Sequence, residues 1–204
     1  MKNVLYIKSS PRGDESFSTK LAEELIKKIE DKYGELYITK LDFAQRPPSH
    51  LSGQHLGAIF TPVEHQSDEQ KDCLKESDTY VEQLKANDTI IISYPVWNFL
   101  VPSCLKAWID QIVRTGVTFH YNGHVPEGLI TGKKVYLVLA RGGMYPDVFD
   151  NNIDSLYDFS IQYMQTVLSY IGMKDVVVIK ADGLAMPDVK DKAMEKAIES
   201  IQIK

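Results

Sequence analysis

Apolar residues in this chain occur in short runs that alternate with helical patterns. Helices are indicated where apolar residues recur three or four positions apart, and strands where apolar residues are continuous or alternate with polar ones. The predicted strands span residues 4–7, 35–41, 89–94, 133–140 and 176–180. The predicted helices span residues 19–33, 68–86, 105–113 and 153–171, with a last helix after Pro187.

The order of these elements predicts the fold class. Short, almost wholly apolar strands separated by helices are typical of a parallel sheet that is covered on both faces. We therefore predict a single α/β domain over residues 1–204, doubly wound around a five-stranded parallel sheet. Two excursions, 43–67 and 114–132, are long for ordinary connections, and each is expected to reach a partner, to form a lid or to be a plain surface loop.

Three loops that follow predicted strands are rich in Ser, Gly, Pro, Asn or aromatic residues. They span residues 9–19, 95–101 and 141–146. In doubly wound sheets, ligands bind at the carboxyl ends of the strands. We therefore expect these three loops to converge on one rim and to form the binding site.

The first loop has the residues of a phosphate site. Ser9, Ser10, Ser16 and Ser18 lie between a strand and a helix, where backbone N–H groups and the helix dipole favour an anion. The loop lacks both G-x-G-x-x-G and G-x-x-x-x-G-K-[ST], which argues against a Rossmann dinucleotide site and a P-loop. A hydroxyl-lined loop of this kind suits flavin mononucleotide (FMN). The alternative is an ordinary N-cap cluster, with Ser16 or Ser18 capping the helix.

The second loop is suited to a flat aromatic ligand. Pro95 and Pro102 bracket it and restrict its backbone. Trp97 and Phe99 can cover a ring, and Asn98 offers both a donor and an acceptor. The alternative is a plain turn whose aromatic side chains are buried in the core.

The third loop begins with Arg141, Gly142 and Gly143. Paired glycines permit positive φ angles or a close approach of the backbone to a ligand. Backbone N–H groups, or Arg141 itself, would stabilise negative charge on a ring that is being reduced. The alternatives are an ordinary glycine turn and a surface position for Arg141.

Composition and charge exclude several classes of partner. The net charge of −5 gives no basic footprint for nucleic acid, and no apolar stretch approaches the length of a membrane span. With the first strand beginning at Val4 and only two cysteines, we expect a cytoplasmic protein with reduced thiols. His120 and His124 have the spacing of a helical metal pair, but Asn122 and Gly123 between them indicate a turn, so no metal site is predicted.

The three loops together resemble the FMN-dependent NADH azoreductase family, flavodoxin-like quinone reductases of bacteria. The resemblance extends over almost the whole chain. Residues 116–119 and 126–133 are its most specific part, because no generic flavin site requires them. Relatives commonly have Met-Tyr at the positions of Val96 and Trp97, and Ser at that of Ala140. They often carry a histidine where this chain has Met144 and Tyr145, so no substrate role is assigned there.

The resemblance implies a set of binding residues. It assigns the FMN phosphate to Ser10, Ser16, Phe17 and Ser18, and the isoalloxazine ring to Val96, Trp97, Asn98, Phe99, Ala140, Arg141, Gly142 and Gly143. No side chain is predicted to be catalytic, because FMN would carry the chemistry.

The resemblance also implies an activity and an assembly. FMN would be tightly bound, NADH would donate a hydride, and a quinone or azo compound would accept it in a ping-pong cycle. Family members are homodimers with active sites at the subunit interface, and we expect the same here. No cluster of Arg residues for a 2′-phosphate is evident, which favours NADH over NADPH. The alternatives are a flavodoxin-type electron carrier and an NAD(P)H-dependent FMN reductase.

Overall fold

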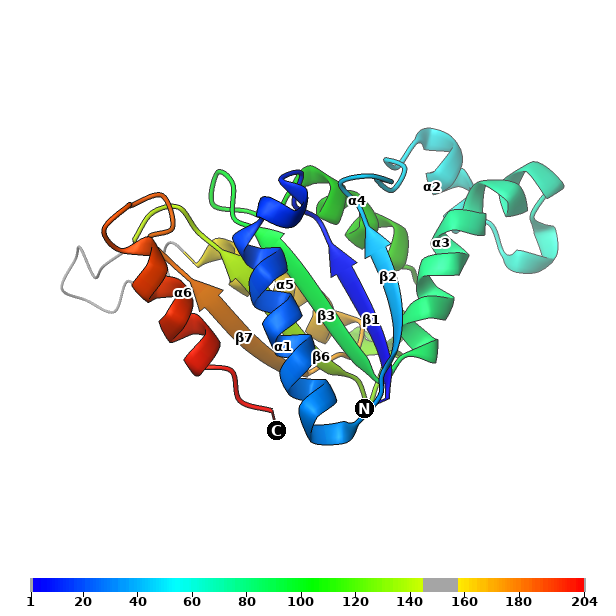
Figure 1. Ribbon diagram of the computed structural model, residues 1–204. Helices are drawn as coiled ribbons and strands as arrows, with labels where there is room; N and C mark the ends of the chain where they lie inside the picture. Colours follow the sequence, from blue (N-terminus) through cyan, green and yellow to red (C-terminus); the bar gives the residue numbers. More distant parts are fainter. Residues whose placement is uncertain (1, 145–157, 204) are drawn as a thin grey trace.

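The computed structural model of the chain describes residues 2–144 and 158–203. Its central sheet has five strands, all paired in parallel, in the order β2-β1-β3-β6-β7 (Figure 1). The strands are β1 (Asn3–Lys8), β2 (Tyr37–Asp42), β3 (Thr89–Pro95), β6 (Lys134–Ala140) and β7 (Asp175–Ala181). The predicted doubly wound, five-stranded parallel sheet is therefore confirmed, with the strand order of the flavodoxin-like fold.

Helices cover both faces of this sheet. One face packs against α1 (Phe17–Tyr33) and α6 (Lys190–Glu199), and the other against α3 (Asp68–Ala86), α4 (Ser103–Ile112) and α5 (Phe159–Tyr170). In β3, Ile91 packs toward α1, whereas Ile90 and Ile92 pack toward the opposite helices. Because successive side chains enter different cores, the strand needs apolar residues at every position.

The bounds of the predicted elements mostly agree with the structure. The helix predicted over 68–86 coincides with α3. β2 begins two residues later than predicted because Gly34 caps α1 and residues 34–36 connect it to the strand. β2 is an edge strand, and its side chains are exposed or half-buried, as its alternating sequence predicts. The first residues of the helix predicted over 153–171 lie outside the described residues, and α5 accounts for the rest.

The two excursions contain small elements of their own. Residues 43–67 include α2 (Gly53–Ile59) and a 3-10 turn, η2 (Val63–His65). Residues 114–132 include an antiparallel hairpin of β4 (Phe119–Asn122) and β5 (Val125–Gly128). The predicted turn is confirmed, because Gly123 connects the two strands with φ of +65°.

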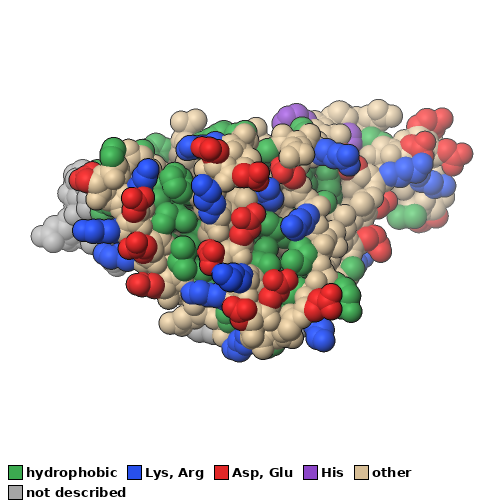
Figure 2. Space-filling view, viewed as in Figure 1, with side chains coloured by type: hydrophobic (Ala, Val, Ile, Leu, Met, Phe, Trp, Pro, Cys, Tyr) green, Lys and Arg blue, Asp and Glu red, His purple; other side chains and the backbone are tan. Residues whose placement is uncertain are grey.

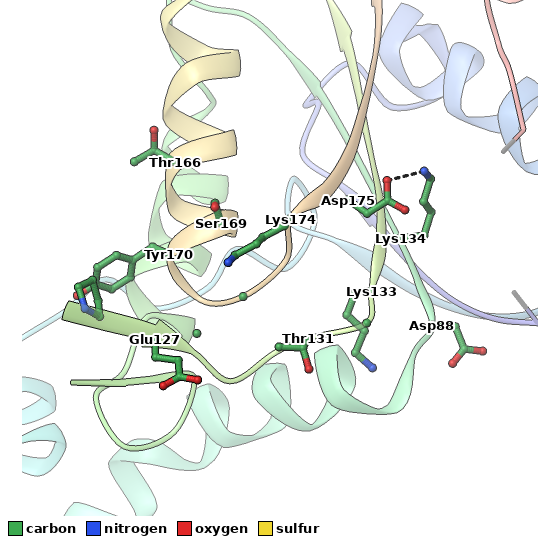
Figure 3. A pocket seen from close by; sticks show the side chains of 14 residues that line it. Asp88, Glu127, Thr131, Lys133, Lys134, Thr166, Ser169, Tyr170, Lys174 and Asp175 are labelled. Atoms are coloured by element: carbon green, nitrogen blue, oxygen red, sulfur yellow. Dashed lines mark hydrogen bonds and ion pairs between the residues drawn. The ribbon is translucent and has the colours of Figure 1, made fainter. Parts of the chain in front are cut away.

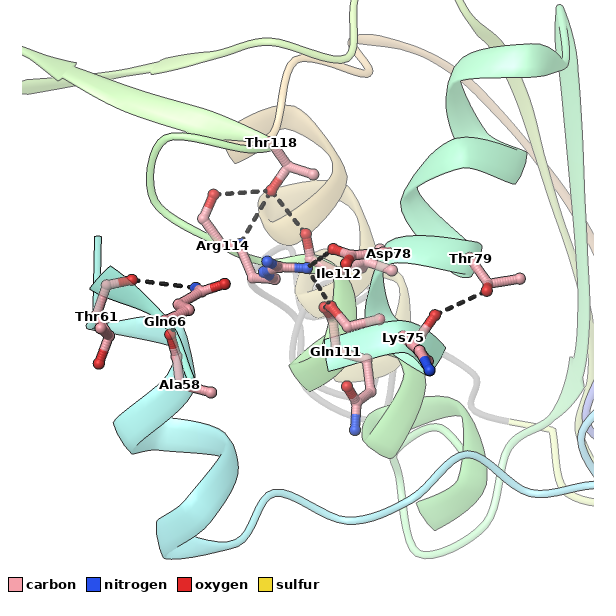
Figure 4. Close-up of polar contacts among 11 residues, drawn as sticks. Ala58, Thr61, Gln66, Lys75, Asp78, Thr79, Gln111, Ile112, Arg114 and Thr118 are labelled. Carbon is pink, nitrogen blue, oxygen red and sulfur yellow. Dashed lines mark hydrogen bonds and ion pairs between the residues drawn. The ribbon is translucent and has the colours of Figure 1, made fainter. Parts of the chain in front are cut away.

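A buried arginine fixes the start of the second excursion (Figure 4). The Arg114 guanidinium donates to Ser77 Oγ at 2.8 Å and to Asp78 Oδ1 at 2.5 Å, both on α3. The Arg114 backbone N–H donates to Thr118 Oγ1 at 3.0 Å. The turn that leads into the β4–β5 hairpin is therefore held against α3 by two charge-assisted hydrogen bonds, one to a hydroxyl and one to a carboxylate.

Charges of both signs are mixed on the face that carries α1 and α6. Figure 2 shows Lys and Arg side chains interspersed with Asp and Glu over these helices, without a large area of one sign. Among the described residues, no helix combines the length and apolarity needed to cross a membrane.

We predict that Gly128→Ala destabilises the fold strongly. A Cβ at this position would lie 2.1 Å from the backbone N of Gly172 and 2.2 Å from the backbone C of Ile171, so main chain would have to move. We expect the free energy of unfolding, measured by urea titration, to fall by at least about 2 kcal/mol. Gly57→Ala is the control. Gly57 lies in α2, and a Cβ at this position would meet no atom within 4 Å. Alanine also has a higher helix propensity than glycine. Equal stability of the two variants would contradict the close approach of the hairpin to the end of α5.

Candidate functional site

Serine side chains organise the amino end of α1. Ser16 is the N-cap: its Oγ accepts from the Thr19 N–H at 3.4 Å and lies 3.0 Å from Ser18 Oγ. The capping role considered from the sequence is therefore present. The Ser16 cap does not use the N–H groups of Phe17 and Ser18. These groups lie in the first turn of α1, where no carbonyl of the helix is available to them. The same serines thus cap the helix and leave two donors at an electropositive helix end.

The loop after β3 closes in a tight two-residue turn. Trp97 and Leu100 each donate a backbone N–H to the other's carbonyl at 3.1 Å. Between them, Asn98 and Phe99 have φ of +49° and +68°, the pattern of a type I′ turn. Asn tolerates this conformation, but a residue such as Phe is strained there by on the order of 1–2 kcal/mol. Strain of this kind is concentrated at functional sites.

The aromatic side chains of this turn are not part of the core. Trp97 is 47% exposed and Phe99 is 44% exposed. The alternative of a plain turn with buried aromatics is therefore wrong. The strained backbone holds two aromatic side chains at the surface, where they are available to a ligand.

A fourth loop, which the sequence did not indicate, supports the loop after β6. Backbone N–H groups of residues 183–185 donate to carbonyls of residues 141–143 at 2.9–3.0 Å. Gly142 has no positive φ, so its role is close packing. A Cβ on Gly142 would lie 3.2 Å from the Ala185 Cβ. The only sequence signal for this loop is Asp182-Gly183 directly after a strand.

These loops enclose a cavity of about 290 Å³ at the carboxyl edge of β1, β3 and β6. The predicted residues that line it are Ser10, Ser16, Phe17, Val96, Trp97, Ala140, Arg141 and Gly142. The predicted residues that do not line it are Ser18, Asn98, Phe99 and Gly143. Lining residues that sequence reasoning missed are Arg12, Pro95, Leu184 and Ala185. Tyr145 lies outside the described residues.

Arg141 is buried, so the alternative of a surface position is wrong. Its side chain is 3% exposed. Its Nε and Nη2 donate to the two carboxylate oxygens of Asp182 at 2.6 and 2.9 Å, and Nη1 donates to Asp158. Burial by itself lowers the pKa of Arg141, but the carboxylates of Asp182 and Asp158 outweigh it and raise that pKa above its ordinary value. The guanidinium is therefore permanently charged.

Cys104 lies near the site but has the properties of an inert thiol. It is in the first turn of α4, and its Sγ lies 3.7 Å from the Ser9 carbonyl oxygen. Burial raises the pKa of the Cys104 thiol, which keeps it protonated. Because the thiolate is the nucleophilic form, this environment does not support catalysis by Cys104.

A larger cavity, of about 1140 Å³, lies at the opposite edge of the sheet (Figure 3). The amino ends of β6 and β7 and the end of α5 border it, and none of the three predicted loops contributes. Two of the three lysines that line it are engaged: Lys134 Nζ donates to Asp175 at 2.7 Å, and Lys133 Nζ donates to the Lys85 carbonyl at 2.6 Å. Volume alone therefore does not identify the site. The smaller cavity at the carboxyl edge has the convergent donors.

The fold and the loops at the strand ends define a flavodoxin-like protein, and comparisons with known proteins agree. Residues 2–204 match the model of a family described as having the flavodoxin-like fold. The chain is 40% identical over 202 residues to an FMN-dependent NADH:quinone oxidoreductase of Herminiimonas arsenicoxydans, covering 98% of this chain and 97% of that protein. It is 41% identical over 207 residues to the protein of the same name in Agrobacterium fabrum, covering 100% and 96%. The chain belongs to the family of FMN-dependent NADH:quinone oxidoreductases.

Solved structures show the same fold. An azoreductase from Bacillus anthracis superposes with a TM-score of 0.85 at 23% identity, covering 98% of this chain and 96% of the other. An FMN-dependent NADH-azoreductase from the same species, solved in complex with FMN, superposes with a TM-score of 0.80 at 22% identity, covering 97% of each chain. At these identities the likeness extends to the fold alone.

We predict that the strain at Phe99 is measurable. Phe99→Gly and Phe99→Ala both remove the ring, but only glycine adopts φ of +68° without a Cβ clash. We expect Phe99→Gly to exceed Phe99→Ala by about 1 kcal/mol in free energy of unfolding, measured on the apoprotein by urea titration. Equal stabilities would show that the turn does not hold this residue in the left-handed region.

Proposed function

We propose that this protein binds FMN at the carboxyl edge of the sheet and reduces quinones and azo compounds with NADH. The observation that carries the proposal is the convergence of the loops after β1, β3 and β6 on one cavity, together with the amino end of α1. The relatives' names support FMN, NADH and quinone as the cofactor and substrates.

The first loop fits the phosphate of FMN. The N–H groups of Phe17 and Ser18, the Ser10 hydroxyl and one of the mutually bonded Ser16 and Ser18 hydroxyls are donors around the amino end of α1. Arg12, which lines the same cavity with its guanidinium 5.8 Å from the Phe17 ring centre, adds a positive charge. Hydroxyls, N–H groups at a helix end and one cation are the donors that a phosphate monoester requires.

The second and third loops fit the isoalloxazine ring. Of the residues predicted for the ring, Val96 and the partly exposed Trp97 line the cavity and would lie along one edge, and Ala140, Arg141 and Gly142 along the other. If backbone groups make the contacts to the ring, Val96-Trp97 and Ala140 can replace the residues common among relatives. A side chain at Gly142 would narrow the cavity.

FMN, when bound, supplies hydride transfer between NADH and the acceptor. The residues around the cavity would hold and orient the ring, and backbone N–H groups would stabilise negative charge that develops on it. The acceptor takes up a proton as well as a hydride, and water can supply that proton without a side chain that transfers it. Both substrates would bind in turn beside the ring in a ping-pong sequence, in which the oxidised nicotinamide leaves before the acceptor binds. NADH is a cytoplasmic reductant, so we assign the protein to the cytoplasm.

We also propose a homodimer formed through the two excursions. Both expose large apolar side chains: Phe60 is 76% and Val63 is 72% exposed in the first, and Tyr121 is 56% and Val125 is 67% exposed in the second. The Arg114 contacts hold the start of the second excursion rigidly (Figure 4). Ordered, exposed apolar residues of this kind mark an interaction surface.

We expect the purified, desalted protein to show a flavin absorption spectrum, or to acquire one when FMN is added to the apoprotein. Addition of NADH under anaerobic conditions should bleach the spectrum, and a quinone should restore it. Gly142→Leu should fail to retain flavin, because the new side chain would meet Ala185. Gly57→Ala serves as the control with flavin retained.

The other outcomes of this experiment separate the alternatives. Flavin that NADH cannot bleach would favour an electron carrier, and reduced flavin that leaves the protein would favour an FMN reductase. A protein that takes up no FMN would overturn the proposal.

We expect sedimentation equilibrium to give twice the mass of the chain. Phe60→Glu with Val63→Glu should shift the protein to a monomer, because charges would replace apolar contacts. Tyr37→Glu is the control: Tyr37 is 66% exposed on the edge strand β2, away from both excursions. A wild-type monomer, or a double variant that remains dimeric, would contradict this arrangement.

A further inference from the structure

Arg141 joins three elements at the rim of the cavity. It follows β6, whereas Asp182 follows β7 and Asp158 directly precedes α5. The Arg141 guanidinium donates to both oxygens of Asp182 and, through its other terminal nitrogen, to Asp158. Planar guanidinium is suited to this geometry, because it can form a two-point contact with one carboxylate and still reach a second.

The described part of the cluster is balanced in charge. Lys180 Nζ lies 3.4 Å from the second oxygen of Asp158, so within residues 2–144 and 158–203 the group consists of two cations and two carboxylates. The carboxylates of Asp158 and Asp182 are 18% and 27% exposed, and Arg141 is 3% exposed. At short range and with little solvent, the positive charge of Arg141 is therefore largely neutralised before it reaches the cavity.

The backbone around this cluster forms part of the cavity wall. Three hydrogen bonds from the N–H groups of residues 183–185 fix the carbonyls of residues 141–143, and Gly142, Leu184 and Ala185 line the cavity. The bidentate Arg141–Asp182 contact connects the first residue of one loop to the first residue of the other. Side-chain and main-chain contacts thus join the same two loops.

We propose that Arg141 is a positioning residue: with Asp182 and Asp158 it sets the separation of the 141–144 and 182–185 loops, and so the affinity of the site for FMN. This inference rests on the proposed function. It differs from the expectation that the Arg141 charge stabilises the reduced ring directly, because the carboxylates already neutralise that charge.

The two roles predict opposite effects of Asp182→Asn. If Arg141 acts by its charge, removal of a neutralising carboxylate exposes that charge, and the anionic cofactor binds more tightly with a raised midpoint potential. If Arg141 positions the loops, loss of the charged two-point contact loosens the wall, and FMN binds more weakly. Arg141→Lys retains the charge but has no planar fork, so a positioning role predicts weaker binding there as well.

Asp175→Asn is the matched control. Asp175 is the first residue of β7, and Asp182 directly follows the last. Each carboxylate accepts a hydrogen bond from a cation on or directly after β6: Lys134 donates to Asp175, and Arg141 donates to Asp182. The Lys134–Asp175 contact lies at the amino ends of the strands, bordering the larger cavity (Figure 3). The control therefore removes an ion pair between the same two strands, β6 and β7, away from the proposed site. It is a single contact to a carboxylate that is 66% exposed, whereas the Asp182 carboxylate is 27% exposed.

The test measures the dissociation constant for FMN by fluorescence quenching on apoprotein, the flavin midpoint potential and the thermal unfolding of the apoprotein. We expect Asp182→Asn and Arg141→Lys to raise the dissociation constant on the order of tenfold or more, as loss of a supporting contact behind a ligand shell does. Asp175→Asn should stay within about twofold, and all three apoproteins should unfold cooperatively.

Each other outcome has a distinct meaning. Tighter FMN binding and a raised potential in Asp182→Asn would overturn the positioning role in favour of direct charge. Equal affinities for FMN in Asp182→Asn, Asp175→Asn and the wild type would also overturn the positioning role. If Asp182→Asn does not fold, wild-type affinity for FMN in Arg141→Lys would overturn it. A wild-type protein that binds no FMN would instead overturn the proposed function.

Discussion

Parallel pairing of the five strands places every strand-to-helix loop at one edge of the sheet. The strands pair in this way because helices carry the chain back across both faces, and both faces are then buried. Segments as distant as 9–17, 95–97, 140–142 and 184–185 therefore meet around one cavity. The site depends on this constraint more than on any single side chain, since its lining residues come from four separate loops.

Rigid support of these loops comes from different sources at each strand. The loop after β1 runs into a capped helix, the loop after β3 closes in a strained turn, and the loop after β6 is held by the loop after β7. In each case main-chain atoms near the cavity are fixed before any ligand binds. Preorganised donors of this kind lower the cost of binding and of charge development in a reaction.

The positive groups at the site are of two kinds: some face the cavity, and one is neutralised by neighbouring carboxylates. The amino end of α1 and Arg12 provide positive potential where a phosphate would lie. Arg141, although charged, is enclosed by two carboxylates. A site for a cofactor with a phosphate at one end and a reducible ring at the other can thus favour the anion strongly while the ring environment remains close to neutral.

The sequence by itself determined the strands, the main helices and three of the four loops. Continuous apolar runs identify strands buried on both sides, and the Ser16 cap acts within a few residues of itself. Only the tertiary structure decided the partners of Arg141 and the place of the 182–185 loop, because Asp182 lies 41 positions away and reaches Arg141 through the pairing of β6 with β7. It likewise decided that Trp97 and Phe99 are exposed. Aromatic residues are suited equally to a core and to a ligand, and the left-handed turn at Asn98 and Phe99 selects between them.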